Sequence, residues 1–125
     1  MSFRTDKARV IGLGTAKEGV GHWWSQRVTS VALVPLTLLF ILPFASALGG
    51  SFEAVRAVYS DTFNAVVAIL FLGVGFHHLQ QGLQVVIEDY VHGPARTAAL
   101  LLNTLACWAL GLTGIFAVAK IAFTA

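Results

Sequence analysis

Long apolar stretches alternate with short polar ones along the chain. The uncharged stretches cover residues 28–52, 62–87 and 97–119. Each is longer than the roughly 20 apolar residues that a helix needs to cross a bilayer. We therefore predict an all-α membrane protein with three transmembrane helices, at about residues 27–48, 62–91 and 95–122.

Proline and glycine indicate where these helices bend and end. Pro35 and Pro43 fall inside the first helix, where a membrane helix tolerates proline and bends rather than breaks. Residues 51–61 are expected to form a short loop whose charged side chains face solvent. The second helix is expected to stop before Gly93-Pro94, because glycine followed by proline is a common helix end.

The composition supports a membrane protein and leaves no room for a soluble catalytic domain. Hydrophobic residues make up 57% of the chain and charged residues 11%, whereas a soluble domain carries about a quarter charged residues. We expect a single membrane-anchor domain, residues 1–125, in which residues 1–26 form a polar tail.

Basic residues are divided unequally between the two membrane faces. Six of the eight Lys and Arg side chains precede the first uncharged stretch or follow the second, which puts them on one face. Because cytoplasmic segments are enriched in Lys and Arg, we predict that the amino terminus is cytoplasmic. The basic balance thus needs no nucleic-acid partner. Residues 1–27 lack the apolar core of a signal peptide, and Asp6 and Glu18 favour a multi-pass protein of a bacterial inner membrane.

The second predicted helix contains polar side chains at a depth where they are costly. They are His77, His78, Gln80, Gln81, Gln84, Glu88, Asp89 and Tyr90. At about 100° per residue, one stripe comprises His78, Gly82, Val85 and Asp89, and a neighbouring stripe comprises His77, Gln81, Gln84 and Glu88. Polar groups inside a membrane usually face a protein interior or a bound group. We therefore expect a polar ligand between helices here.

His78 is the candidate ligand of a haem iron. It lies about half-way across the hydrocarbon core, where a neutral imidazole can coordinate haem axially. Gly82, one turn along the same stripe, leaves space for a porphyrin. His77 is the rival ligand and points about 100° away. One helix does not readily place both histidines on opposite sides of a haem, so a second ligand should come from another chain. The alternative is a histidine that only hydrogen-bonds a neighbouring helix.

A second candidate site lies at the cytoplasmic membrane face. The start of the first helix and the end of the second share this face, which collects Trp23, Trp24, Arg27, Glu88, Asp89 and Tyr90. Such residues suit an amphipathic ligand such as a quinone, because a tyrosine O–H can donate to its carbonyl and a nearby acid can assist proton uptake. Two interpretations stay open for the start of the first helix. Either its aromatic and basic residues are headgroup anchors, or a pocket is lined by His22, Trp24, Arg27 and Thr29.

Two motifs carry a resemblance to a known family. The first is His78 followed by ten residues and Asp89-Tyr90, with Gly82 four residues after the histidine; the second is the pre-helical segment GHWWSQRVTS. Together with the three spans, they resemble the small hydrophobic membrane-anchor subunit of succinate dehydrogenase, respiratory complex II, in its alphaproteobacterial form. The resemblance covers nearly the whole chain.

This resemblance implies a role in passing electrons from succinate to the quinone pool, without catalysis by the chain in isolation. His78 would be an axial ligand of haem b, shared with the cytochrome b556 anchor subunit. Arg27 would lie near the haem propionates, with Gly82 in the pocket. Tyr90 would bind ubiquinone near the iron–sulfur subunit, with Asp89 supporting the site. A flavoprotein subunit would complete the complex.

Other functions fit part of the same pattern. A haem-free structural anchor would only dock soluble subunits on the membrane, and a fumarate reductase anchor would serve the reverse reaction. A small transporter subunit is a further alternative. Transporters often have paired repeats and interrupted helices, and this sequence shows no repeat.

Overall fold

Helices account for nearly all of the described chain. The computed structural model describes residues 3, 5–12 and 19–124. Within these residues there is no strand, and the helices are α1 (Asp6–Ile11), α2 (Val20–Ala47), α3 (Phe52–Ser60), α4 (Thr62–Tyr90) and α5 (Pro94–Thr124). The helices α2, α4 and α5 are long and apolar enough to cross a membrane. The prediction of an all-α protein with three transmembrane helices is confirmed.

The first transmembrane helix begins earlier than the sequence predicts. Helix α2 starts at Val20 rather than near Arg27, so residues 20–26 belong to the helix and not to a tail. No charge or proline interrupts this segment, and the Trp23 amide already donates to the Gly19 carbonyl at 3.0 Å. The helix is also continuous through both of its prolines. Of the rest of the expected tail, residues 6–11 form α1, and residues 13–18 lie outside the described part.

The segment expected to be a loop contains the short helix α3. The Ser51 hydroxyl accepts a hydrogen bond from the Ala54 amide at 3.3 Å and caps its first turn. One side of α3 is apolar, and Tyr59 on that side is buried; burial raises the pKa of its phenol above the usual value. The Arg56 guanidinium donates to the Thr124 carbonyl. Arg56 is exposed, as predicted, and it also holds the last turn of α5 through this hydrogen bond.

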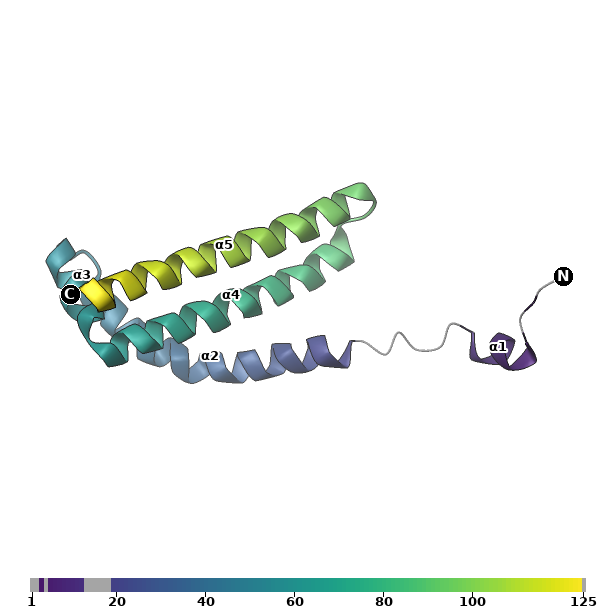
Figure 1. Cartoon of the computed structure of the whole chain (residues 1–125), viewed down its shortest axis with the longest axis horizontal. Coiled ribbons are helices and arrows are strands. Elements are labelled where there is room, and N and C mark those ends of the chain that lie inside the picture. The colour runs from purple at the N-terminus through teal and green to yellow at the C-terminus, as the bar shows by residue number, and fades with distance from the viewer. Residues whose placement is uncertain (1–2, 4, 13–18, 125) are drawn as a thin grey trace.

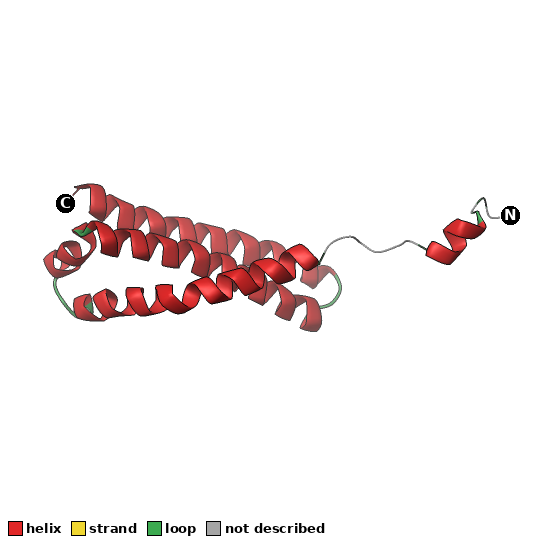
Figure 2. Cartoon of the chain, turned by 90° about the horizontal axis from the view of Figure 1, so that it is seen from below, coloured by secondary structure: helices red, strands yellow, loops and turns green. Residues whose placement is uncertain are grey.

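Helix α4 lies between α2 and α5 (Figure 1) and packs on both of them. Within the described residues α2 and α5 do not contact each other. The start of α2, the end of α4 and the start of α5 share one end of the bundle, while α3 and the end of α5 share the other (Figures 1 and 2). The bundle is thus open, and parts of α4 on both sides are uncovered by its own chain.

The α4/α5 interface is close because it is built from small residues. A Cβ atom at Gly111 would lie 3.1 Å from the Cβ of Phe76, and one at Gly114 would lie 3.2 Å from a methyl of Leu72. Small residues at such positions let membrane helices approach. Nearer the start of α5, the buried Asn103 amide donates to the Gln80 carbonyl at 2.9 Å. This interface satisfies its own polar groups.

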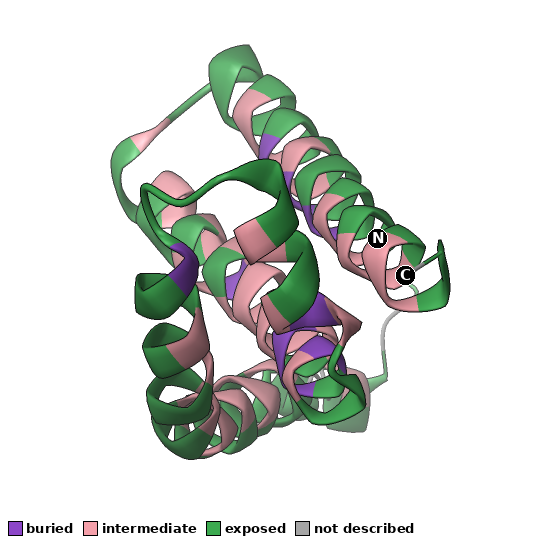
Figure 3. Cartoon of the chain, turned by 90° about the vertical axis from the view of Figure 1, so that its left-hand side faces the viewer, coloured by how far each residue is buried: buried purple, intermediate pink, exposed green. Residues whose placement is uncertain are grey.

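Few side chains are buried in the chain alone (Figure 3). The buried residues of the three long helices concentrate in α4 and α5, and none lies in the most apolar window of α2. The exposed surface therefore includes many large hydrophobic side chains, among them Val31, Leu42, Leu102 and Phe116. A surface of this kind suits contact with lipid or with other membrane subunits.

Candidate functional site

A layer of polar side chains fills the half of the α2/α4 interface nearest the start of α2. Its α2 members are His22, Ser25, Gln26 and Thr29, and its α4 members are His77, His78 and Gln81, with Gly82 beside them. His22, Gln26 and Thr29 follow the i, i+4, i+7 spacing of one helix face. We call these residues the polar layer. Beyond it the same interface becomes apolar, with the rings of Phe40 and Phe71 stacked at 4.3 Å.

His78 is held between the two helices through both ring nitrogens. Its Nδ1 lies 2.8 Å from the Thr29 hydroxyl, and its Nε2 lies 3.4 Å from the side-chain nitrogen of Gln26. The Thr29 hydroxyl also lies 2.8 Å from the Ser25 carbonyl of its own helix. The imidazole therefore has a fixed plane before any ligand binds.

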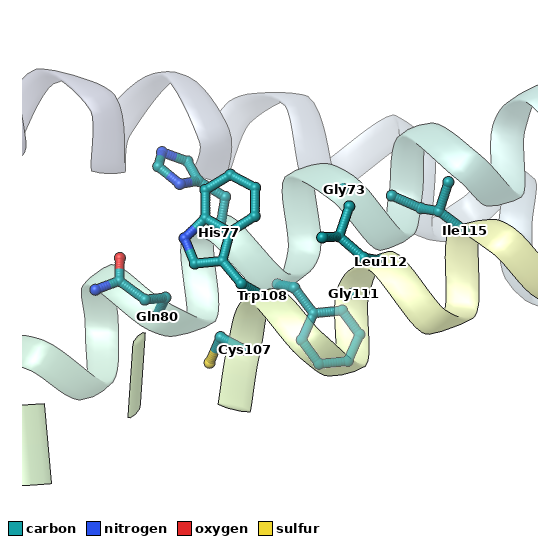
Figure 4. Close-up of a pocket in the computed structure, with 9 residues that line it drawn as sticks. Gly73, His77, Gln80, Cys107, Trp108, Gly111, Leu112 and Ile115 are labelled. Atoms are coloured by element: carbon teal, nitrogen blue, oxygen red, sulfur yellow. The ribbon is translucent and has the colours of Figure 1, made fainter. Parts of the chain in front are cut away.

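His77 has a different environment although it is the next residue. It is exposed, and its Nε2 lies 3.2 Å from the Ser25 hydroxyl, which donates to the Gln81 side-chain carbonyl at 3.3 Å. His77 also lines an open crevice of about 50 Å³ between α4 and α5 (Figure 4). The other residues of this crevice are mostly apolar: Gly73, Phe76, Gln80, Cys107, Trp108, Gly111, Leu112 and Ile115.

The residues around His78 fit a haem-type ligand by three observations. First, the side-chain oxygen of Gln26 and Nε2 of His22 are buried without a hydrogen-bond partner in the described chain, and buried polar atoms are normally paired. Second, a Cβ atom at Gly82 would meet only the Gln26 amide, at 3.6 Å. Third, the described residues contain no cluster of three His, Cys, Asp or Glu side chains. A ligand that takes one imidazole from this chain, as haem can, is compatible with these surroundings.

The residues predicted for the membrane-face site lie at the end of α4. Tyr90 is 80% exposed, and Asp89 is also exposed. Glu88 accepts a hydrogen bond from the Gln84 amide at 3.0 Å, which partly compensates a carboxylate at the unfavourable end of a helix dipole. Tyr90 and Asp89 are therefore available to another molecule or subunit.

In the described chain Arg27 contacts Trp23 of the predicted membrane-face residues and makes no ion pair with Glu88 or Asp89. Its guanidinium carbon lies 5.4 Å from the centre of the Trp23 ring, on a part of α2 that is exposed. Among the described residues the one ion pair joins Arg9 and Asp6, so Arg27 does not neutralise Glu88. Its guanidinium is open to a partner outside the chain.

Sequence reasoning missed Ser25 and Gln26 as members of the polar layer. Both lie before the predicted start of the first helix, so no helical phase was assigned to them. The signal that could have found them is the spacing of His22, Gln26 and Thr29, read as one face of a helix that begins at Val20.

The chain matches the family described as succinate dehydrogenase/fumarate reductase transmembrane subunit over residues 1–120. It belongs to this family. It is 36% identical to the succinate dehydrogenase hydrophobic membrane anchor subunit of Paracoccus denitrificans, over 96% of this chain and 93% of that protein. It is 33% identical to the protein of the same name from Rickettsia bellii, over 71% of each chain. The succinate dehydrogenase membrane anchor subunit of Reclinomonas americana is 29% identical over 62% of this chain and 67% of its own. No solved structure matches the chain significantly.

These likenesses confirm the predicted identity as a succinate dehydrogenase membrane anchor, and they decide against the transporter alternative. With its three candidate spans, the anchor is a multi-pass membrane protein that associates with other subunits of the complex.

Proposed function

We propose that this anchor binds one side of a b-type haem through His78 and helps form a ubiquinone site with Tyr90 and Asp89. Electrons from succinate oxidation would then reach the quinone pool at this subunit. A bound haem supplies reversible one-electron chemistry, and its potential depends on the axial ligands and on hydrogen bonds to them. The anchor itself contributes binding and orientation.

The observation that carries this proposal is the way in which the two neighbouring histidines are held. Nδ1 of His78 is held by the Thr29 hydroxyl at 2.8 Å. Its Nε2 has only a long contact, 3.4 Å, with the side-chain nitrogen of Gln26. His77 is anchored through Nε2 instead. Metal-bound imidazoles use one nitrogen for the metal and the other for an orienting hydrogen bond. Nε2 lies farther from the backbone than Nδ1 and is the more accessible ligand atom, which favours His78.

The partners follow from what this chain lacks. Its described residues offer one suitably held imidazole, so the second axial ligand would come from the cytochrome b556 anchor subunit. The exposed guanidinium of Arg27 would then meet a haem propionate at the boundary between the two anchors. The amino terminus, and with it Tyr90, would lie on the cytoplasmic side, where the iron–sulfur subunit and the flavoprotein dock.

The quinone part of the proposal rests on exposure and chemistry. The phenol of Tyr90 can donate a hydrogen bond to a quinone carbonyl, and its 80% exposure leaves it free to do so. Asp89 precedes it and is exposed as well, so its carboxylate can hold a proton for the reduction. Both groups lie about three helical turns beyond His78, at the end of α4.

One observation favours a second candidate, a haem-free structural anchor. The Gln26 amide is within 3.4 Å of Nε2 of His78, so the polar layer can close without a cofactor. In that case the hydrogen bonds of His78 would only join α2 to α4.

Redox-difference spectra of the purified complex separate the two candidates. We expect a b-type signal that is lost in His78→Ala and kept in His77→Ala, with succinate oxidation by an artificial acceptor unchanged in both. The same signal in His78→Ala as in the unaltered complex would exclude ligation by His78. No b-type signal in the unaltered complex would favour the haem-free anchor.

A further inference from the structure

The Thr29 hydroxyl has three hydrogen-bond neighbours, so it must act as both donor and acceptor. It lies 2.8 Å from the Ser25 carbonyl, 3.2 Å from the Gln26 carbonyl and 2.8 Å from Nδ1 of His78. A hydroxyl has one hydrogen to donate and can accept through its lone pairs. Carbonyl oxygens only accept, so a hydroxyl that donates to either carbonyl must accept from His78.

The contact at Nε2 of His78 agrees with a hydrogen on Nδ1. The side-chain nitrogen of Gln26 is a donor only. In the orientation that the structure gives this amide, the nitrogen lies 3.4 Å from Nε2 of His78 and matches an accepting Nε2. A neutral imidazole with an accepting Nε2 carries its hydrogen on Nδ1. That hydrogen points at the Thr29 hydroxyl, so each of the two contacts of the His78 ring pairs a donor with an acceptor.

We propose that Thr29 is the positioning residue of the haem ligand: it accepts the Nδ1 hydrogen of His78, fixes the tautomer and the ring plane, and so directs the Nε2 lone pair toward the iron. This inference rests on the proposed haem ligation by His78. The Ser25 carbonyl completes the arrangement, because it holds the hydrogen of the Thr29 hydroxyl. Helix α2 thus orients a ligand that belongs to α4.

In this arrangement the Gln26 side chain moves when the cofactor binds. Its amide nitrogen lies near Nε2 of His78 and over Gly82, in the space that a porphyrin edge would need. Its side-chain oxygen has no partner in the described chain, so moving the side chain breaks only one long contact. Thr29, by contrast, has short contacts on both sides and stays.

An orienting hydrogen bond also affects the iron electronically. Donation from Nδ1–H to an oxygen makes the imidazole a more basic ligand, and a more basic ligand favours ferric iron. Removal of the Thr29 oxygen should therefore raise the midpoint potential of the haem. A purely structural role for Thr29 would not move this potential in a set direction.

The test is a redox titration of the b-type signal in the intact complex carrying Thr29→Val or Thr29→Ser. Valine keeps the shape of threonine but has no oxygen, whereas serine keeps the oxygen. The matched control is Thr113→Val, which removes a hydroxyl bonded at 2.7 Å to the Ala109 carbonyl on the exposed side of α5. Succinate oxidation by an artificial acceptor reports assembly in each variant.

We expect Thr29→Val to raise the midpoint potential or to release the haem, and Thr29→Ser and Thr113→Val to behave like the unaltered complex. An unchanged potential at full haem content in Thr29→Val would overturn the role of Thr29. Equal loss of haem in the valine and serine variants would also overturn it, because the oxygen would then not be what matters. If the signal survives in His78→Ala, or is absent from the unaltered complex, the proposed haem ligation fails and this inference fails with it.

Discussion

Helix α4 meets its two neighbours in different ways. Against α5 it packs closely at glycine positions, with the Cβ of Phe76 near Gly111. In the same interface the buried Asn103 amide donates a hydrogen bond to the backbone carbonyl of Gln80. Against α2 it forms the polar layer, in which side chains of the two helices contact each other. The side-chain oxygen of Gln26 has no hydrogen-bond partner there in the described chain. The α4/α5 interface pairs its polar groups within the chain. The polar layer leaves buried polar atoms unpaired in the described chain, and the proposed cofactor would be bound there.

The largest expected effect comes from placing a large side chain in the α4/α5 interface. In Gly111→Leu even the first added carbon would lie 3.1 Å from Phe76, so α5 must move away from α4. Overpacking of a well-packed site costs about 1–3 kcal/mol or more. We expect little assembled complex in membranes, measured as succinate oxidation with an artificial acceptor. Thr113→Leu, on the exposed side of the same helix, is the control and should assemble normally. Normal assembly of Gly111→Leu would contradict the described packing.

The same substitution in the polar layer should have a different result. In Gly82→Leu the nearest atom is the end of the flexible Gln26 side chain, at 3.6 Å, so the helices need not separate. The added side chain occupies the space proposed for the porphyrin. We expect a severalfold lower ratio of haem to flavin in a complex that still assembles. Full haem content in this variant would show that the cofactor lies elsewhere.

Tyr90 lies outside both interfaces, so its substitution should affect neither packing nor haem. We expect Tyr90→Phe to lower succinate–quinone reductase activity severalfold, because the hydrogen bond to the quinone carbonyl is lost. Succinate oxidation by an artificial acceptor and the b-type spectrum should stay unchanged. If both activities fall together, the complex has failed to assemble and the site assignment is unsupported. Unchanged succinate–quinone reductase activity in Tyr90→Phe would contradict the proposed contact with quinone.

The smallest expected effect concerns a hydrogen bond in the α4/α5 interface. Asn103→Leu removes the 2.9 Å bond to the Gln80 carbonyl, and such bonds between membrane helices contribute about 0.6 kcal/mol. We expect a slightly lower Tm for the purified complex with an unchanged haem spectrum. A changed spectrum would mean that the two sides of α4 are coupled.

The fold was largely predictable because its main signal is the length of uncharged stretches. The stripe that joins His78 to Gly82 was also predictable, since both lie deep inside a long helix whose phase is secure. The start of α2 was not, because residues 20–26 contain no cap or charge that marks a helix end. The phase of Arg27 relative to Thr29 was predictable as well. Two residues separate it from Thr29, or about 200° around a helix, so both cannot face α4.

The most direct test of the account is a map of the intact complex at a resolution that shows side chains. We predict that Nε2 of His78 coordinates a haem iron, that Nδ1 stays on the Thr29 hydroxyl, and that the Gln26 amide has moved from its position over Gly82. A map in which Gln26 still contacts His78 and the cofactor is absent, or is bound by His77, would contradict the account.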